Sequence, residues 1–367
     1  MFDLKTLDSY KPIDDKLYRV MDEKGKIILK DWKPSISDPE ILKAYQDLLF
    51  ERTVDLMAVS YQRQGRMYTY PPNLGQEAIH IAAGKVIQPE DWLVPAFREL
   101  GAWLAKGVKL SEIFLYFKGH EDGSKFLNAN RMLPVSVPIA SQLVHAAGLG
   151  YAMNYQDEKA AVFGFVGDGG TSEGDFHEAL NFASVWNAPV VFVVQNNQFA
   201  ISVPLKMQTR SINLAVKGVA YDVPSVMVDG NDFFAMHEVL SFAREYVLEH
   251  KRPFLIEAKT YRIGAHTTSD DPTRYRSKEE EDIWAQRDPA KRLQAWLVKH
   301  KLWDPALEEE LTAQFRMQID AEFEAAENYP EYKLDDVFGY MYETLPDELK
   351  RQKNNYQNYL KTQGATQ

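Results

Sequence analysis

One polar cluster in the chain combines glycines, a carboxylate and a carboxamide at a spacing that suits phosphate and metal binding. Three glycines, Gly167, Gly169 and Gly170, surround Asp168, and Asn197 lies 30 positions after Gly167. Glycine lets backbone N–H groups approach a phosphate closely near a helix N-terminus. Asp168 and Asn197 offer hard oxygen ligands with one negative charge, which suits Mg²⁺ or Ca²⁺ bridged to a diphosphate. The plainer alternative is a glycine turn with a helix-capping aspartate.

The surrounding pattern brings these residues together if it folds as one βαβ unit. Apolar runs at residues 161–166 and 190–194 indicate buried strands, and residues 174–186 between them indicate a helix. A right-handed crossover makes the strands parallel, so Asp168 and Asn197 both follow carboxyl ends at one sheet edge, where open α/β sheets bind ligands. Two familiar phosphate motifs are absent: the Walker Gly-Lys-Ser/Thr does not occur, and Gly-x-Gly-x-x-Gly fails at its last position.

The remaining pattern predicts an α/β fold with a doubly wound, mostly parallel sheet and helices on both faces. Further buried strands are expected at residues 225–228 and 254–258, because both runs are apolar without alternation. Helices are expected at residues 39–64, 76–86, 141–155, 232–250 (with Asp232 as N-cap), 291–300 and 308–327. The expected domains are an irregular N-terminal arm (1–40), the α/β domain (41–330) and a C-terminal extension (331–367).

Composition excludes several classes of function. The 367 residues carry 42 Lys and Arg against 53 Asp and Glu, a net charge of −11, which argues against binding of nucleic acid or an anionic membrane. The sequence has no cysteine, so disulfides, thiolate metal sites and cysteine nucleophiles are excluded. No basic segment followed by an apolar run opens the chain, and no apolar stretch reaches the roughly 20 residues of a membrane span. We therefore expect a cytoplasmic protein.

The segment GDGGTSEGDFHEALNFASVWNAPVVFVVQNN resembles the thiamine-diphosphate motif, in which GDG is followed some 30 positions later by NN. Three further segments fit the same family in the same order: AFRELG (96–101), VPIASQ (137–142) and YRIGAHTTSDDPTRYR (261–276). Over residues 40–330 the chain is similar to alpha subunits of the decarboxylating component of 2-oxo acid dehydrogenases. Bacterial pyruvate dehydrogenases are the most similar, with branched-chain 2-oxo acid dehydrogenases close behind. The resemblance implies the thiamine-diphosphate-binding fold.

The resemblance also implies a cofactor and metal site, residue by residue. Asp168 and the Asn197 side chain would ligate Mg²⁺, and the Phe199 carbonyl would complete the protein ligands. The residues implied to bind thiamine diphosphate are Phe97, Arg98, Val137, Ile139, Gly167, Asp168, Gly169, Gly170, Asn197 and His266. A potassium-binding loop like that of the branched-chain relatives would consist of Ser136, Ser141 and Gln142.

Several of these residues have a plainer alternative. Arg98 would pair with the diphosphate, since its planar fork binds two oxygens at once, but a surface ion pair to Glu99 is the simpler interpretation. Ile139 would hold the cofactor bent, yet an isoleucine at this place also fits a core position. Phe97 stands where relatives commonly carry tyrosine, so any hydroxyl contact is lost there.

His266 is the one histidine of eight that we predict to be catalytic. It follows an expected buried strand and lies in a long polar loop, where a neutral imidazole could donate or accept a proton. In relatives the corresponding histidine faces the cofactor and assists transfer to the lipoyl group. Thr267 stands where mitochondrial relatives carry a phosphorylated serine, so control by phosphorylation is not expected.

The implied function is thiamine-diphosphate- and Mg²⁺-dependent oxidative decarboxylation of pyruvate, with reductive acetylation of a lipoyl group on a partner acyltransferase. The implied partners are a beta subunit that supplies the activating glutamate, in an assembly of two alpha and two beta chains, and dihydrolipoyl dehydrogenase. Within the family, branched-chain 2-oxo acids and acetoin remain alternative substrates, because a methylene is worth only about 1–3 kcal/mol in a pocket. Two alternatives of a different functional class are a non-catalytic structural or regulatory paralogue that retains the fold and a generic Mg-nucleotide-binding α/β protein.

Overall fold

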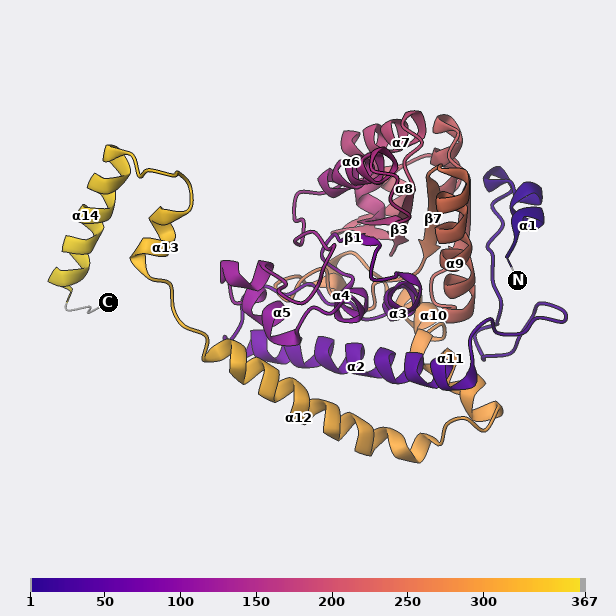
Figure 1. Cartoon of the computed structure of the whole chain (residues 1–367). Helices are drawn as coiled ribbons and strands as arrows, with labels where there is room; N and C mark the ends of the chain where they lie inside the picture. The colour runs from indigo at the N-terminus through magenta and orange to yellow at the C-terminus, as the bar shows by residue number, and fades with distance from the viewer. Residues whose placement is uncertain (1, 364–367) are drawn as a thin grey trace. The chain divides into compact units, whose positions relative to one another are not determined.

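The structure, a computed structural model, describes residues 2–363. The chain divides into two compact units, the first ending at Phe323 and the second beginning at Glu324 (Figure 1). The first unit holds the sheet and the cavity described below, and the second contains the last two helices, α13 and α14. The domain limits expected at residues 40 and 330 stay predictions.

The secondary structure alternates between helices and strands as the sequence predicts. The strands are β1 (Trp92–Val94), β2 (Val162–Gly167), β3 (Val190–Asn196), β4 (Phe199–Ala200), β5 (Val203–Pro204), β6 (Ser225–Asp229) and β7 (Phe254–Lys259). The helices are α1 (Leu4–Ser9), α2 (Asp38–Arg63), α3 (Glu77–Val86), α4 (Leu100–Lys106), α5 (Leu110–Phe117), α6 (Ser141–Tyr155), α7 (Gly174–Val185), α8 (Leu205–Gln208), α9 (Phe233–His250), α10 (Lys278–Ala285), α11 (Pro289–Lys299), α12 (Glu308–Glu327), α13 (Leu334–Gly339) and α14 (Asp347–Thr362).

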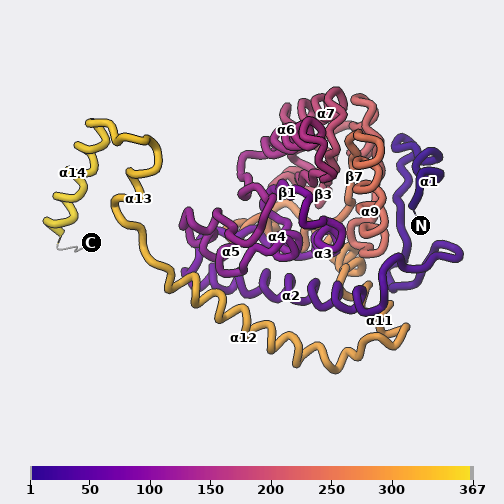
Figure 2. The backbone as a smooth tube through the Cα atoms, in the orientation of Figure 1, coloured from indigo at the N-terminus to yellow at the C-terminus, as the bar shows by residue number. Residues whose placement is uncertain are grey.

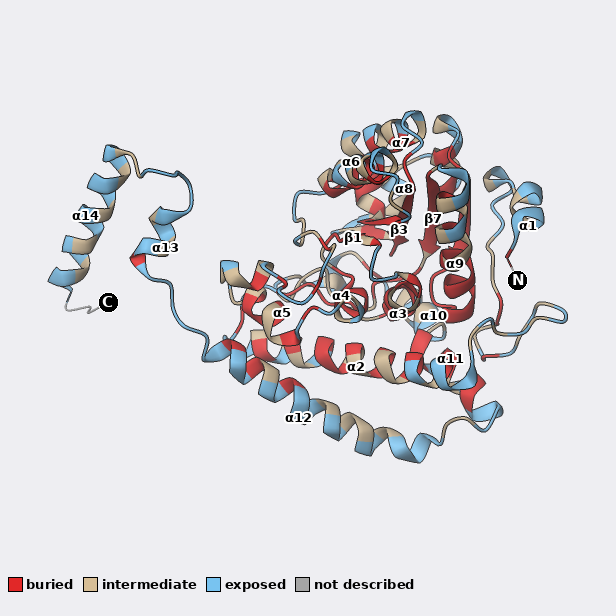
Figure 3. Cartoon of the chain, in the orientation of Figure 1, coloured by how far each residue is buried: buried red, intermediate tan, exposed pale blue. Residues whose placement is uncertain are grey.

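Within the described residues, five strands form one parallel sheet in the order β1-β2-β3-β7-β6. The register pairs Val162 with Val190 and Gly167 with Gln195, so β2 and β3 end side by side. All residues of β3 are buried, as Figure 3 also shows, which explains why the strand is an unbroken apolar run. The predicted α/β fold with a parallel sheet is confirmed, and the βαβ unit has the expected geometry.

Helices cover both faces of this sheet. Successive strand residues point to opposite faces, and Gly164 of β2 lies against Leu143 and Ala146 of α6 on one face. On the other face, the Phe254 ring of β7 packs edge-on against Phe242 of α9, with ring centroids 5.9 Å apart. Figure 1 shows α6 and α7 lying together beside the strands. The sheet core is therefore buried from both sides, and only its edges and strand ends remain available for a site.

The N-terminal arm is less irregular than the sequence suggests. It contains the short helix α1, and it runs beside α9 (Figure 2). Tyr18 forms a parallel bridge to Val228 of β6, and its hydroxyl donates to Glu238 of α9 over 2.7 Å. The arm thus extends the sheet edge, a contact that local periodicity could not reveal because the partners are about 200 positions away.

Asp232 joins the arm to the domain and gives a first prediction. Its buried carboxylate caps α9 by accepting from Phe234 N and Ala235 N, and its second oxygen accepts from Val20 N and Met21 N, each over 2.8 Å. Asp232→Ala leaves these donors unsatisfied, so we expect a loss of about 3 kcal/mol in the free energy of unfolding, measured in urea.

The control for this prediction is Asp3→Ala. Asp3 caps α1 with the same chemistry but at the surface, accepting from Thr6 N over 2.7 Å. Its loss should cost about 1 kcal/mol or less. Equal effects of the two substitutions would contradict the structural role assigned to Asp232.

A membrane span is not found in the part of the chain that the structure describes. None of the helices formed by residues 2–363 combines the length and apolar composition needed to cross a bilayer.

Candidate active site

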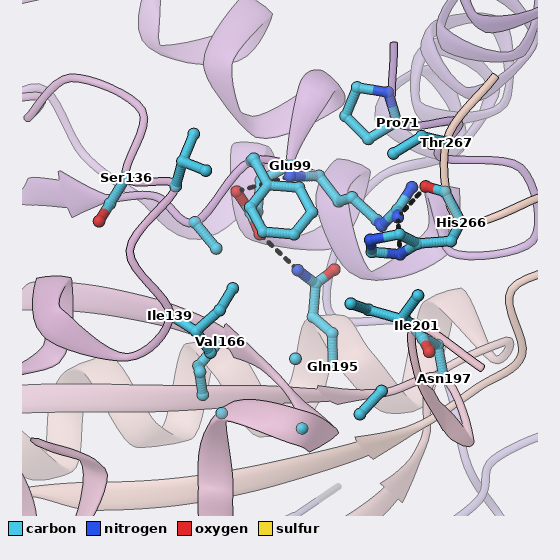
Figure 4. Close-up of a pocket in the computed structure, with 18 of the residues that line it drawn as sticks. Pro71, Glu99, Ser136, Ile139, Val166, Gln195, Asn197, Ile201, His266 and Thr267 are labelled. Carbon is cyan, nitrogen blue, oxygen red and sulfur yellow. Dashed lines mark hydrogen bonds between the residues drawn. The ribbon is translucent and has the colours of Figure 1, made fainter. Parts of the chain in front are cut away.

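A cavity of about 720 Å³ opens at the carboxyl edge of the sheet, where β2, β3 and β7 end. Every residue that the sequence predicts for binding of thiamine diphosphate or Mg²⁺ lines it: Phe97, Arg98, Val137, Ile139, Gly167, Asp168, Gly169, Gly170, Asn197, Phe199 and His266. In Figure 4, Ile139 and Val166 lie on one side of the cavity and His266 on the other. The structure therefore brings the whole predicted set together, while contact of each residue with a ligand stays a prediction.

Three oxygen atoms converge at one corner of this cavity. The amide atom of Asn197 that faces the corner is its Oδ1, which lies 3.1 Å from Phe199 O and 3.2 Å from Asp168 Oδ1. On its other side, Asn197 Nδ2 donates to Gln76 Oε1 over 3.3 Å. No hydrogen lies between the three oxygens in this orientation, so their mutual approach is unfavourable unless a cation joins them.

The opposite orientation of the Asn197 amide would place Nδ2 in the corner, where it would donate to both Phe199 O and Asp168 Oδ1. Which orientation holds depends on whether a cation is present, because an amide flip is decided by its surroundings. Burial raises the pKa of Asp168 to about 6, although the Gln208 side chain opposes this by donating to Asp168 Oδ2 over 2.9 Å. A divalent cation would hold the carboxylate ionised. One carboxylate and two neutral oxygens are a set that Mg²⁺ accepts when phosphates supply further ligands.

The glycines beside Asp168 leave space that no side chain could share. A Cβ at Gly169 would lie 2.6 Å from the Ala200 Cβ, and one at Gly170 would overlap the Val166 side chain. Residues Asp168–Ser172 form a 3₁₀ turn that leads into α7. This turn therefore presents backbone rather than side chains to the cavity, as a phosphate site at a strand-to-helix turn requires.

Arg98 lies in the cavity wall with only 5% of its surface exposed. Its Nη1 donates to Pro72 O over 2.5 Å, and its Nη2 donates to His266 Nδ1 over 3.0 Å and to His266 O. All these partners are uncharged, and Glu99 accepts only the Arg98 backbone N–H, over 3.2 Å. The surface ion pair with Glu99 that the sequence left open is therefore not formed.

A second arginine, Arg262, is buried at the same cavity. It donates to Phe199 O and Ile201 O over 3.3 and 2.6 Å, and to the Tyr275 hydroxyl over 3.0 Å. Burial, together with the nearby charge of Arg262, lowers the pKa of Arg98 to about 9. The hydrogen-bond partners of both buried guanidinium groups are uncharged, so an anionic ligand could supply the ion pair that each lacks.

His266 is held in its neutral form. Burial, together with the charges of Arg98 and Arg262, lowers its pKa to about 4. Because a guanidinium only donates, the Nδ1 atom facing Arg98 must accept, so the ring proton is on Nε2. The His266 backbone N–H donates to Asp270 Oδ2 over 2.8 Å, which fixes the loop near the ring. The ring can therefore act as a hydrogen-bond donor through Nε2 at neutral pH.

The wall opposite His266 is apolar and locally strained. Ile139 is 47% exposed although its neighbour Ala140 is fully buried, and Ala140 adopts a left-handed conformation with φ of 69°. A non-glycine residue with positive φ is uncommon and is typical of sites where the backbone must hold a side chain in place. Here it ends the loop that places Ile139 and Val137 in the cavity wall.

The loop predicted to bind potassium has two of its three side chains together. The Ser136 and Ser141 hydroxyls lie 3.3 Å apart, and both donate to Pro138 O. The third residue, Gln142, turns away and donates through Nε2 to Phe165 O over 2.7 Å. A potassium site here stays a prediction.

Sequence reasoning missed several polar residues of the cavity wall. Those of greatest consequence are Gln76, Glu99, Gln195 and Arg262, all of which line the cavity. Gln195 and Arg262 could have been found, because each lies at or just beyond the end of a predicted strand at the same sheet edge. Gln76 and Glu99 come from segments before helices, and no local pattern points to them.

Comparison with known proteins identifies what the chain is similar to. Residues 45–335 match the sequence model of the family described as dehydrogenase E1 component. The chain is 40% identical over 341 residues to the pyruvate dehydrogenase E1 component subunit alpha of Acholeplasma laidlawii, which covers 92% of this chain and 99% of the relative. The Staphylococcus aureus (strain Mu50) protein of the same name is 34% identical over 355 residues, 95% of this chain and 96% of the relative.

A relative with a different name matches over a shorter stretch. The 3-methyl-2-oxobutanoate dehydrogenase subunit alpha of Mycobacterium tuberculosis (strain H37Rv) is 41% identical over 309 residues, which is 84% of both chains. Identity alone therefore does not separate the two substrate classes, although the pyruvate dehydrogenase subunits align over more of the chain.

Proposed function

Because this chain belongs to the dehydrogenase E1 component family, we propose that it is the alpha subunit of a pyruvate dehydrogenase E1 component. Its reaction is the oxidative decarboxylation of pyruvate with reductive acetylation of a lipoyl group on an acyltransferase. The family implies thiamine diphosphate as the cofactor. When bound, thiamine diphosphate supplies the electron sink that decarboxylation of a 2-oxo acid requires.

The observation that carries this proposal is the charge of the cavity. Arg98 and Arg262 are buried there with uncharged partners, close to the converging oxygens of Asp168, Asn197 and Phe199. A diphosphate with a divalent cation fits both features at once, since the anion neutralises the guanidinium groups and the cation joins the oxygens. Asp168, Asn197 and Phe199 O would hold Mg²⁺, and the backbone of Gly169 and Gly170 would face the diphosphate.

The apolar wall has a different task in this proposal. Ile139 and Val137 would pack against the organic part of the cofactor and exclude water there, and Ile139 would support its bent form. Phe97 would add an apolar face without a hydroxyl contact. A potassium ion bound near Ser136 and Ser141 would stabilise the loop that ends at Ala140.

His266 would act after decarboxylation, during transfer to the lipoyl group. Its Nε2–H would face the cavity as a hydrogen-bond donor, and Arg98 keeps the ring oriented through Nδ1. We expect His266→Ala to retain decarboxylation with an artificial electron acceptor within about twofold, but to slow lipoyl acetylation about 100-fold. The matched control is His145→Ala, an exposed histidine of α6, which should change neither rate. Equal losses in both assays for His266→Ala would refute the assignment.

The partners follow from the family, and their details are part of the proposal. An E1 alpha subunit works with a beta subunit and with the other enzymes of a 2-oxo acid dehydrogenase complex. We propose that the beta subunit supplies the glutamate that activates the cofactor, in an assembly of two alpha and two beta chains in the cytoplasm. The acyltransferase carries the lipoyl group, and dihydrolipoyl dehydrogenase reoxidises it.

The test uses the alpha chain alone and together with its beta chain. Pyruvate turnover should require both chains, Mg²⁺ and thiamine diphosphate. The second candidate, a branched-chain enzyme, is favoured by the Mycobacterium tuberculosis relative. Relative turnover of pyruvate and 3-methyl-2-oxobutanoate by the alpha–beta complex distinguishes the two. Absence of turnover with either substrate, or with acetoin, would favour a non-catalytic paralogue, and turnover by the alpha chain alone would refute the shared site.

A further inference from the structure

A chain of buried polar side chains connects the cavity with the interior of the helical layer. Glu51 of α2 lies 2.5 Å from His80 Nδ1 through its Oε1, and His80 Nε2 lies 2.7 Å from Gln195 Oε1. Gln195 Nε2 then donates to Glu99 Oε1 over 2.6 Å, the bond drawn in Figure 4. The four residues are at most 2% exposed. Only Gln195 and Glu99 reach the cavity wall.

The hydrogen bonds of this chain all point toward Glu99. Because Gln195 donates to Glu99 through its nitrogen, its oxygen must accept, so His80 Nε2 carries a proton. His80 and Glu51 then share one further proton: either Glu51 is neutral and donates to Nδ1, or the pair is His⁺ and carboxylate. The pair has no net charge in either form. It therefore fixes the direction of the Gln195 amide without adding charge to the interior.

Charged groups around the pair favour this arrangement. Burial raises the pKa of Glu51, and the carboxylates of Glu77 and Asp55 raise it further, while His80 opposes the shift. Burial disfavours charge on His80, but the Glu51 carboxylate beside it raises the pKa of the ring. In addition, Glu51 Oε2 has no hydrogen-bond partner among the described residues. The pair thus holds its proton tightly.

Glu99 is the group at the cavity end of the chain. Burial raises its pKa to about 7, and the charge of His80, the Arg98 backbone N–H and the Gln195 side chain all oppose the shift. Glu99 therefore changes charge near neutral pH, next in sequence to Arg98. The other titrating groups of the cavity differ: His266 stays neutral, and Asp168 belongs to the proposed metal site.

We propose that Glu51, His80 and Gln195 are positioning residues that hold Glu99 in its ionised form, and that binding of the anionic cofactor proceeds with uptake of one proton by Glu99. The physical reason is electrostatic. An ionised Glu99 adds a negative charge to the wall of the cavity that would hold the diphosphate, within electrostatic range of Arg98, and protonation removes that charge. The inference rests on the proposed function, since it takes thiamine diphosphate as the anion.

The first test compares wild type with Glu99→Gln in the alpha–beta complex at saturating Mg²⁺. The Kd for thiamine diphosphate is measured by titration calorimetry between about pH 6 and about pH 8. The phosphate of the ligand titrates too, so the readout is the ratio of the two Kd values at each pH. We expect a ratio near one at about pH 6, and about five- to tenfold weaker binding by wild type at about pH 8. A ratio that does not change with pH overturns the proposal.

The second test breaks the chain at His80 with a matched pair of amides. Asparagine reaches only as far as imidazole Nδ1, so His80→Asn keeps the contact to Glu51 and loses the one to Gln195. Glutamine reaches as far as Nε2, so His80→Gln keeps the donor to Gln195. At about pH 8 we expect His80→Asn to have the same Kd for thiamine diphosphate as Glu99→Gln, because Gln195 is no longer held toward Glu99, which then stays protonated. We expect His80→Gln to have the Kd of wild type. If His80 had a merely structural role, both substitutions would change the Kd equally.

These outcomes distinguish failure of the inference from failure of the proposed function on which it rests. If wild type binds no thiamine diphosphate at any pH, the proposed function fails. If it binds but Glu99→Gln follows the same pH dependence, only the inference fails. Should His80→Asn not fold, as a melting curve would reveal, the Glu99→Gln comparison still decides the matter.

Discussion

Replacing Arg98 by methionine is expected to raise the Kd for thiamine diphosphate about 100-fold or more, without lowering the melting temperature of the cofactor-free complex. Arg98 is buried, the hydrogen-bond partners of its side chain are uncharged, and it lines the cavity in which the diphosphate would bind. Two charge-assisted hydrogen bonds to phosphate account for a loss of this size. Because Arg98 is buried and its side chain hydrogen-bonds only uncharged groups, its replacement by an apolar side chain should cost the empty protein little. Calorimetric titration and thermal melting measure the two effects.

The matched control for this substitution is Arg244→Met. Arg244 of α9 is also largely buried, but it pairs with the buried carboxylate of Asp91 over 2.6 Å, away from the cavity. Its removal leaves Asp91 unpaired, so we expect destabilisation by about 3–5 kcal/mol with an unchanged Kd. The two variants should therefore show opposite patterns. If Arg98→Met destabilises the fold and spares the Kd, Arg98 is a structural residue and not a diphosphate ligand.

Replacing Asp168 by asparagine is expected to weaken Mg²⁺-dependent binding of thiamine diphosphate about 100-fold or more. The substitution keeps the shape of the side chain and removes the only negative charge among the three converging oxygens. Asn197→Ala removes the second oxygen and should have a similar effect. The measurement is cofactor binding at increasing Mg²⁺ concentration, with Asp175→Asn in the first turn of α7 as a control that leaves the Mg²⁺ dependence unchanged.

A double substitution sharpens this test. Asp168→Asn combined with Asn197→Asp restores one carboxylate and one carboxamide at the same corner. We expect the double variant to recover part of the Mg²⁺ affinity that Asp168→Asn alone removes. The reason is that the two kinds of ligand are both present again, with their positions exchanged. An Asp168→Asn protein with the Mg²⁺ dependence of wild type would exclude Asp168 as a metal ligand.

The strands of the central sheet could be predicted because they are buried on both faces. β2, β3, β6 and β7 are short apolar runs, and their limits agree with the prediction to within two residues. β1 was missed for a physical reason: it has three residues, Trp92–Val94, followed directly by Pro95. So short a run forms a strand only because Leu93 pairs with Phe163 of β2, which is a tertiary effect.

The helices show the same division between local and tertiary causes. α6 and α12 begin and end where the sequence predicts. α1 lies in the arm expected to be irregular, and it depends on the side chain of Asp3 as a cap. α5, Leu110–Phe117, was not predicted, although its buried residues Leu110, Ile113, Phe114 and Phe117 recur at helical spacing. With 8 residues, α5 is shorter than the windows in which helical periodicity is usually recognised.

Part of the candidate site could be predicted because the order of the strands along the chain determines where their ends lie in the sheet. Asp168 and Asn197 meet because parallel strands in register end at one edge, which spacing can reveal. Arg98 and Ile139 could be assigned only from family resemblance. The Glu51–His80 contact joins residues 29 positions apart on two helices, and Gln195 lies a further 115 positions away. Such contacts depend on how the helices pack on the sheet, and no sequence spacing predicts them.

The most direct measurement of the central claim is the position of the metal ion. Crystals of the alpha–beta complex grown with thiamine diphosphate and Mn²⁺ in place of Mg²⁺ would reveal the ion by its anomalous scattering. The account predicts one peak about 2.1 Å from Asp168 Oδ1, Asn197 Oδ1 and Phe199 O, with the remaining ligands supplied by the diphosphate and water. A cofactor bound with its metal elsewhere, or with the Asn197 amide nitrogen directed at Asp168, would contradict it.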